Sequence, residues 1–147
     1  MIIIRQAGIA NLDQLAALFD GYRCFYGQPS DVEAARQFLS DRIQHQQSVV
    51  FMACEGEEGL GFTQLYPSFT STRLMPILIL NDLYVHPGAR RRGIGKALLA
   101  AATDHARQIG AARLSLSTAH DNHDAQALYE AEGWSRETHF IGYNKSL

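Results

Sequence analysis

A basic, glycine-bearing segment between an apolar stretch and a helical repeat constrains the fold of this sequence more than any other feature. The apolar stretch at 77–85 stops at His86-Pro87-Gly88, and Arg90-Arg91-Arg92-Gly93-Ile94-Gly95-Lys96 follows. Apolar residues then recur at helical spacing as far as Ile109. This order predicts a strand, a tight turn and a helix. Because the first backbone N–H groups of a helix lack partners within the helix, the turn could bind a phosphate group.

Other phosphate-binding turns fit this segment poorly. A Walker loop needs a glycine where Arg90 stands and a hydroxyl residue where Ala97 stands, which argues against an ATPase. A dinucleotide-binding turn needs a third glycine where Leu98 stands. A basic, solvated loop with no ligand is the remaining alternative at this point.

The rest of the chain alternates between strand and helix signals. Capping residues at Asn11 and Gln14, and at Ser30 and Glu33, predict two helix starts, and Pro67 is expected to end a strand. Strands are expected at 2–4, 49–54, 60–66, 77–85 and 114–117, with two more after Trp134; helices are expected at 11–24, 30–43, 94–109 and 125–131. The order predicts one mixed α/β domain over residues 1–147.

Composition and charge exclude several other classes of protein. Thirteen basic and 15 acidic residues give a net charge of −2, so a polycation built for nucleic acid is not expected. No apolar run approaches the roughly 18 residues of a membrane span. Cys24 and Cys54 lack the spacing of a disulfide framework or of a cysteine-rich metal site. We therefore expect a soluble cytoplasmic protein with reduced thiols.

Two motifs give the sequence a specific resemblance. The segment from Arg90 to Gly95 resembles the R/Q-x-x-G-x-G/A signature of the GNAT N-acetyltransferases, and Asn122-x-x-Ala125-x-x-Leu128-Tyr129-x-x-x-Gly133-Trp134 resembles a later motif of that family. The resemblance implies an acetyltransferase that uses acetyl-CoA as its acetyl donor. It also implies a mostly antiparallel central sheet of six or seven strands flanked by four helices.

The resemblance assigns expected roles to residues of this sequence. The backbone of Leu83, Tyr84 and Val85 would bind the pantetheine arm, and Asn122 would hydrogen-bond the pantetheine or adenine side. Tyr129 would protonate the leaving thiolate, which a phenol can do. The pyrophosphate would lie on Arg90, Arg91, Arg92, Gly93, Ile94, Gly95 and Lys96.

The acceptor side is expected around the strand at 77–85. Asp82 is the carboxylate that would bind or deprotonate an acceptor amine, with Asn81 beside it. Tyr22, Tyr26 and Tyr66 could form an aromatic pocket for a cationic amine, or could be ordinary packing. The sequence is also similar to the polyamine- and histone-acetylating branch of the family, which leaves small amines, polyamines and protein lysines as acceptors.

Several alternatives accompany this prediction. His120-Asp121-Asn122-His123-Asp124 is better explained by helix capping than by metal binding, so no metal is expected. An acyl-CoA-binding sensor without turnover is the second functional reading, and an anion- or nucleic-acid-binding module ranks last. Members of the family often pair through C-terminal strands, so Phe140-Ile141-Gly142-Tyr143 predicts a homodimer edge.

Overall fold

The computed structural model describes residues 1–147 and divides them into two compact units, Met1–Ser117 and Thr118–Leu147. The strands are β1 (Ile2–Gln6), β2 (Val49–Glu55), β3 (Glu58–Thr70), β4 (Met75–Val85) and β5 (Leu114–Ser115). The helices are α1 (Leu12–Phe25), α2 (Val32–Gln44), α3 (Ile94–Gln108) and α4 (His123–Ala131), with single 3-10 turns at Ile9–Asn11 and Pro87–Ala89. None of the helices has the length and apolar character needed to cross a membrane.

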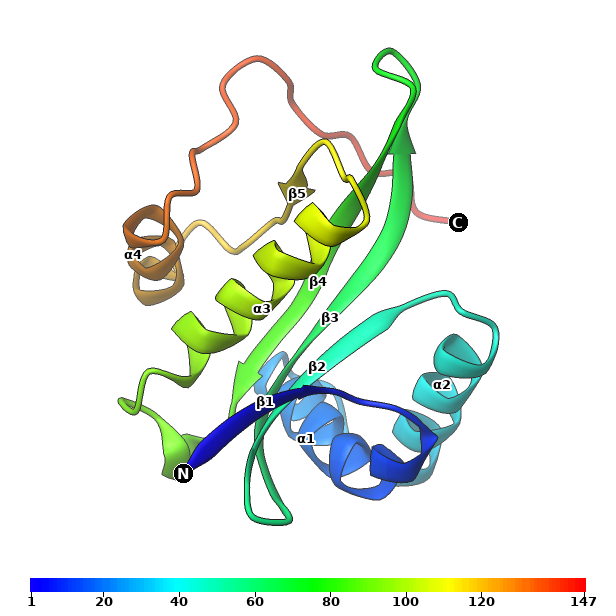
Figure 1. Ribbon diagram of the computed structural model, residues 1–147, viewed down its shortest axis with the longest axis vertical. Coiled ribbons are helices and arrows are strands. Elements are labelled where there is room, and N and C mark those ends of the chain that lie inside the picture. Colours follow the sequence, from blue (N-terminus) through cyan, green and yellow to red (C-terminus); the bar gives the residue numbers. More distant parts are fainter. The chain divides into compact units, whose positions relative to one another are not determined.

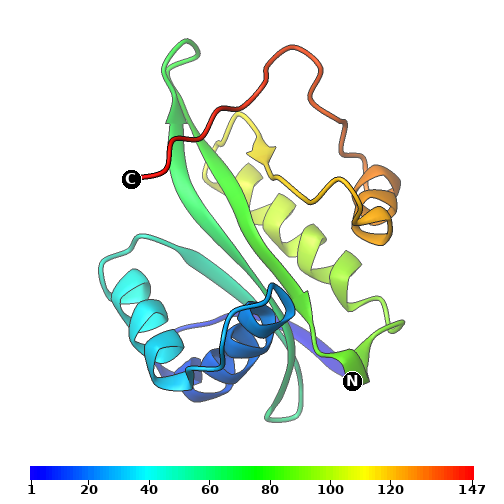
Figure 2. The ribbon, with the colours of Figure 1, turned by 180° about the vertical axis from the view of Figure 1, so that it is seen from behind.

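The first unit is a mixed five-stranded sheet with helices on both faces. The strand order is β1-β2-β3-β4-β5; the first four strands pair antiparallel, whereas β4 and β5 pair in parallel. Helices α1 and α2 cover one face and α3 covers the other (Figures 1 and 2). The α/β class and the mostly antiparallel sheet are therefore confirmed, although the sheet has five strands where six or seven were expected.

Each face of the sheet carries its own apolar core, because strand side chains alternate between faces. Toward α1 and α2, Phe62 and Met52 pack with Leu15 and Leu39. Toward α3, the core contains Ala53, Leu60, Ala89, Ile94 and Leu98, with Leu83 and Val85 packed against them. Residues of β4 therefore alternate between the α3 face and the α1–α2 face.

Strand β3 does not end at Pro67 as expected. It runs to Thr70, with Pro67 opposite Leu78 on β4. The pairing with β2 stops at Leu65, so β3 has an unpaired edge beyond that residue. Proline is tolerated at a strand edge because the missing N–H is not needed there.

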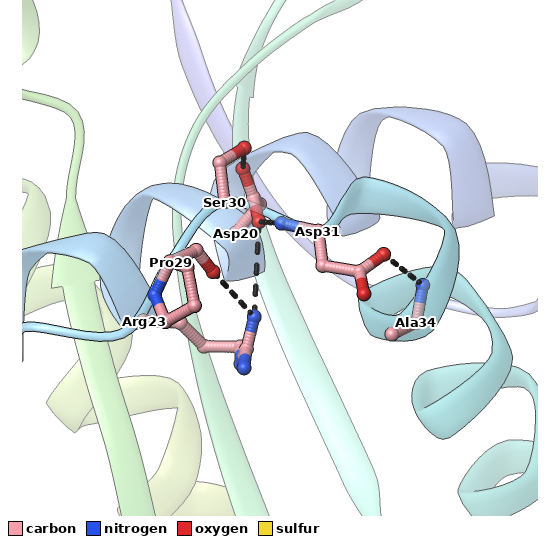
Figure 3. A network of polar contacts seen from close by, with 6 residues as sticks. All are labelled: Asp20, Arg23, Pro29, Ser30, Asp31 and Ala34. Carbon is pink, nitrogen blue, oxygen red and sulfur yellow. Dashed lines mark hydrogen bonds and ion pairs between the residues drawn. The ribbon is translucent and has the colours of Figure 1, made fainter.

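Asn11 is the N-cap residue of α1 as expected, although without the expected cap bond, whereas α2 has a different N-cap residue. Asn11 makes no cap bond to α1, and its side chain accepts a hydrogen bond from the Gly8 N–H at 3.0 Å. Asp31, rather than Ser30, caps α2 by accepting from the Ala34 N–H at 3.0 Å. A buried carboxylate, Asp20, explains the shift, because it accepts from the Ser30 hydroxyl and from the Asp31 N–H, each at 2.7 Å (Figure 3).

The second unit holds α4 and an extended C-terminal segment. Residues 132–147 contain no strand, so the two strands expected after Trp134 are wrong in this structure. Phe140, Ile141 and Tyr143 are largely exposed. An apolar stretch needs a neighbouring strand for its backbone hydrogen bonds, and this segment pairs with none.

Candidate functional site

Strand β4 has a bulge on its β3 side and an open edge on its β5 side. Gln64 of β3 lies opposite Asp82, whereas the next residue, Leu65, lies opposite Leu80, so Asn81 is the extra residue. On its other side β4 pairs with β5 only through Leu78 and Ile79. From Leu80 to Val85 that edge of β4 therefore has no strand beside it.

The pairing pattern shows which backbone groups face this open edge. The His86 N–H donates to the Leu60 carbonyl at 2.8 Å, which makes these two residues a hydrogen-bonded pair. Because antiparallel pairs alternate, the N–H and carbonyl groups of Leu83 and Val85 point away from β3, whereas those of Tyr84 point toward it. Of the three residues expected to bind a pantetheine arm, Leu83 and Val85 thus have their backbone groups on the open side.

The turn after β4 ends in a helix start with no side-chain cap. Gly93 is the N-cap of α3 with a left-handed backbone (φ 75°), and no side chain bonds to the first-turn N–H groups. Arg91 also has a positive φ, 66°. Nothing lies within 4 Å of the position that a Cβ atom on Gly93 would take. This geometry fits an anion such as a pyrophosphate, held by the N–H groups of Ile94, Gly95 and Lys96.

The three arginines of the turn differ in their partners. Arg90 donates its Nε–H to the Val85 carbonyl at 3.2 Å, with its guanidinium 5.9 Å from the Phe25 ring centre. Arg92 forms a two-bond ion pair with Glu55 at 2.7 and 3.3 Å. The Arg91 side chain has no ion pair or hydrogen bond. Arg91 is therefore the arginine most available to a phosphate group.

Asp82 is a buried carboxylate held by neutral donors. It is 4% exposed, and it accepts from the Gln64 Nε2 at 2.7 Å and from the Asn81 Nδ2 at 3.1 Å. Burial raises the pKa of Asp82, and hydrogen bonds from Gln64, Tyr22 and Asn81 oppose that rise. No cation contributes to the shift. The side chain of Asn81 is exposed beside it, so the structure places both predicted acceptor residues together.

The three predicted acceptor tyrosines differ in how near they lie to the Asp82 carboxylate. The Tyr22 ring lies 5.0 Å from that of Tyr26 and 5.8 Å from that of Phe62. Tyr66 is half-buried, and burial together with the Asp82 charge raises the pKa of its phenol to about 12. Tyr26 is 53% exposed and its only described ring contacts are with Tyr22 and Phe25. Tyr22 thus hydrogen-bonds to the carboxylate and Tyr66 is close enough to feel its charge, whereas Tyr26 contacts Tyr22 instead.

A separate cavity of about 700 Å³ lies between α1, the start of β3 and the end of β4. Its lining includes Tyr84, His86 and Pro87 but neither Asp82 nor Tyr66. The cavity is therefore distinct from the group of side chains around Asp82.

The second unit carries Asn122 and Tyr129 on α4. The Asn122 side chain caps this helix by accepting from the Ala125 N–H at 3.3 Å. The Tyr129 ring lies 6.0 Å from Trp134, and the Trp134 N–H donates to the Tyr129 carbonyl at 3.0 Å. Capping by Asn122 was expected for this segment. The structure contains no group of three or more His, Cys, Asp or Glu side chains that could hold a metal ion.

Two residues of the site were missed by the sequence analysis. Gln64 donates a hydrogen bond to Asp82, and Glu55 forms an ion pair with Arg92. A glutamine in an otherwise apolar strand, Gly61-Phe62-Thr63-Gln64-Leu65, is the signal that could have indicated Gln64. No local signal indicates Glu55, because its partner lies 37 residues away.

Comparisons with known proteins agree with this architecture. The sequence profile of the Acetyltransferase (GNAT) family matches residues 15–134. The uncharacterized N-acetyltransferase YhfO of Bacillus subtilis (strain 168) is 47% identical over 140 residues, which are 95% of this chain and 94% of YhfO.

Solved structures show the same fold. A crystal structure of a probable acetyltransferase has a TM-score of 0.94 at 43% identity, covering 99% of this chain and 97% of that chain. The aminoglycoside N-acetyltransferase AAC(6')-Iy, solved in complex with CoA, has a TM-score of 0.82 at 22% identity and covers 100% of this chain and 96% of that chain. At that identity the likeness shows the fold alone.

Proposed function

Because this chain belongs to the acetyltransferase (GNAT) family, we propose that it transfers an acetyl group from acetyl-CoA directly to a primary amine. The acetyltransferase class follows from the family. The amine acceptor, the site residues and the direct transfer in a ternary complex are the proposal. Cys24 is exposed and Cys54 is buried, and neither lies among the residues of the site, which favours transfer without an acyl-cysteine intermediate.

The observation that supports an amine acceptor is that the Asp82 carboxylate is buried and no cation of the protein contributes to its pKa shift. Burying a charge that lacks an opposite charge is costly, and the neutral donors Gln64, Asn81 and Tyr22 only partly offset that cost. An ammonium group would supply the missing positive charge and could give a proton to Asp82. The tyrosine rings beside it would favour the same cation.

The donor side is supported by the turn and the open edge. Acetyl-CoA, when bound, supplies the acetyl thioester. The N–H groups at the start of α3, with Arg91 and Lys96, would hold its pyrophosphate, and Leu83 and Val85 would hold its pantetheine arm. We further propose that Tyr129 protonates the departing thiolate and that Asn122 combines capping of α4 with a contact to the cofactor.

The acceptor, the assembly and the location complete the proposal. Small amines, polyamines and protein lysines are the proposed acceptors. The exposed apolar side chains of Phe140, Ile141 and Tyr143 support a homodimer, for which a monomeric mass in light scattering would be the opposing result. The unpaired thiols Cys24 and Cys54 are consistent with a cytoplasmic location.

A thiol-release assay over a panel of amines tests the proposed function. We expect acetyl-CoA-dependent turnover with at least one primary amine, and loss of most of that turnover in Asp82→Asn. Asp104→Asn is the matched control, because Asp104 is exposed on α3. Acetyl-CoA binding in calorimetry without turnover on any amine would favour the sensor, and an absence of binding would refute the proposal.

A further inference from the structure

We propose that Gln64 is a positioning residue for the transfer reaction: its side-chain amide holds the Asp82 carboxylate in the orientation in which it accepts a proton from the acceptor amine. The inference rests on the proposed function, in which Asp82 is the base.

The one hydrogen bond of the Gln64 side chain is to Asp82. It is fully buried, and it lies opposite Asp82 where the β4 bulge begins. Its Nε2 donates to Oδ2 of Asp82 at 2.7 Å, which is the only hydrogen bond of this side chain. Its Oε1 is buried and has no hydrogen-bond partner. The amide therefore serves one contact, which ends on the candidate base.

The apolar core by itself does not account for a glutamine at this position. An amide that is buried with one of its two polar groups unpaired costs free energy. The neighbouring position on the same face of β3 is Phe62, which is equally buried and apolar. An apolar side chain at position 64 would fill the core but would leave the buried Asp82 without this donor, so the amide points to a role at Asp82.

The hydrogen bond from Gln64 distinguishes the two oxygens of the Asp82 carboxylate: one lies toward the interior and the other toward the surface. Gln64 binds Oδ2, whereas Oδ1 lies 3.1 Å from the side-chain amide of the exposed Asn81. Oδ1 is therefore the oxygen on the side from which an amine would arrive. Fixing Oδ2 prevents rotation of the carboxyl group and keeps Oδ1 directed to that side.

The proton balance of the step follows from this geometry. An N–H bond of the acceptor ammonium breaks, the proton goes to Asp82, and the nitrogen keeps the electron pair. That pair attacks the thioester carbonyl carbon, so a C–N bond forms and the C–S bond breaks with its electrons on sulfur. The nitrogen then releases its second proton to become an amide, and the thiolate takes up one proton, from the proposed donor Tyr129, to become the free thiol. The donor from Gln64 favours the charged carboxylate before the step. The other titratable neighbours are Tyr22 and Tyr66, with Arg42 acting on Tyr66, and burial together with the Asp82 charge raises the pKa of the Tyr66 phenol to about 12.

The pH dependence of Gln64→Met tests the inference, because methionine keeps the length of the side chain and removes the donor. A hydrogen bond to a charged group, once lost, should raise the midpoint of the acidic limb of kcat/KM by about one pH unit. Turnover below that midpoint should fall about tenfold and recover at higher pH. Gln64→Leu is the second variant if Gln64→Met folds poorly.

Thr63→Val is the matched control. Thr63 is equally buried on the same strand, and its hydroxyl donates to the backbone carbonyl of Asp82 at 2.8 Å rather than to the carboxylate. This variant also removes one hydrogen bond to Asp82, so a purely structural effect should appear in both variants. We expect the control to keep the wild-type pH profile.

The outcomes separate the two proposals. A Gln64→Met profile that coincides with those of wild type and Thr63→Val overturns the positioning role and leaves Asp82 as the base. An acidic limb that persists in Asp82→Asn shows that Asp82 is not the base, so the proposed function fails in that part and the positioning role falls with it.

Discussion

Replacing Gly61 by alanine tests how closely β3 approaches the end of β4 and the start of α3. A Cβ atom at position 61 would lie 2.7 Å from the Tyr84 carbonyl oxygen, 3.3 Å from Val85 Cα and 3.3 Å from Ile94 Cγ2. Two of these contacts are with backbone, which cannot rotate away as a side-chain end can. The strand, the helix start or both must therefore shift.

The magnitude follows from two opposing effects. Overpacking of a well-packed site costs about 1–3 kcal/mol. Alanine also lowers the entropy of the unfolded chain relative to glycine, which returns about 0.5–1 kcal/mol. Because the 2.7 Å contact is with a backbone oxygen, the overpacking cost should lie in the upper half of its range. We therefore expect Gly61→Ala to lower the free energy of unfolding by about 1–2.5 kcal/mol and the thermal midpoint by about 2–10 °C. Acetyl-CoA affinity should fall as well, because Gly61 pairs with Val85 and contacts the first residue of α3.

Urea unfolding gives the stability change, and calorimetry gives the affinity. Gly8→Ala is the matched control, because Gly8 has an extended backbone (φ −132°, ψ −168°) and nothing lies within 4 Å of its Cβ position. The control should be neutral or slightly more stable than wild type. Equal stability of Gly61→Ala and Gly8→Ala would refute the argument from close approach.

Three further predictions follow from the turn and from the first loop. Arg91→Gln should weaken acetyl-CoA binding about three- to tenfold in calorimetry, and more than Arg92→Gln does, because Glu55 already occupies Arg92; the reverse order would contradict this assignment. Gly93→Ala should destabilise the start of α3 by about 1–2 kcal/mol in urea unfolding because of its positive φ, whereas an unchanged midpoint would argue against a left-handed cap. Hydrogen bonds from Ser30 and Asp31 lower the pKa of Asp20, so its contribution to stability is complete above the ordinary carboxyl pKa and is lost as pH falls through the lowered value. Thermal melts of Asp20→Asn should lack that part of the acid dependence that wild type shows; equal acid dependence would exclude Asp20 as its source.

The polar contacts of the site show where sequence-based prediction stops. The glycines, arginines and strand–turn–helix order of residues 77–109 are local, so they could be predicted from spacing. The bulge at Asn81 could not, because it depends on how β4 pairs with β3. The unequal roles of Arg90 and Arg92 also depend on partners elsewhere, on the last β4 carbonyl and on Glu55.

The strand ends show the same division. Pro67 is a strand terminator by its own chemistry, yet β3 continues because β2 has already ended beside it. The strands expected after Trp134 have the right composition, but a strand forms only with a neighbour, and none pairs with that segment.

The sequence by itself determined the α/β class, the glycine turn before a helix and the family, because these depend on local periodicity, backbone freedom and motif spacing. The tertiary structure alone decided which side chains meet. Gln64 and Tyr22 both hydrogen-bond to Asp82, and Asp20 accepts from the loop before α2. Those contacts join residues of different elements. Burial increases the energetic importance of these contacts, because a carboxylate such as Asp82 is costly to enclose until the folded chain supplies its hydrogen-bond donors.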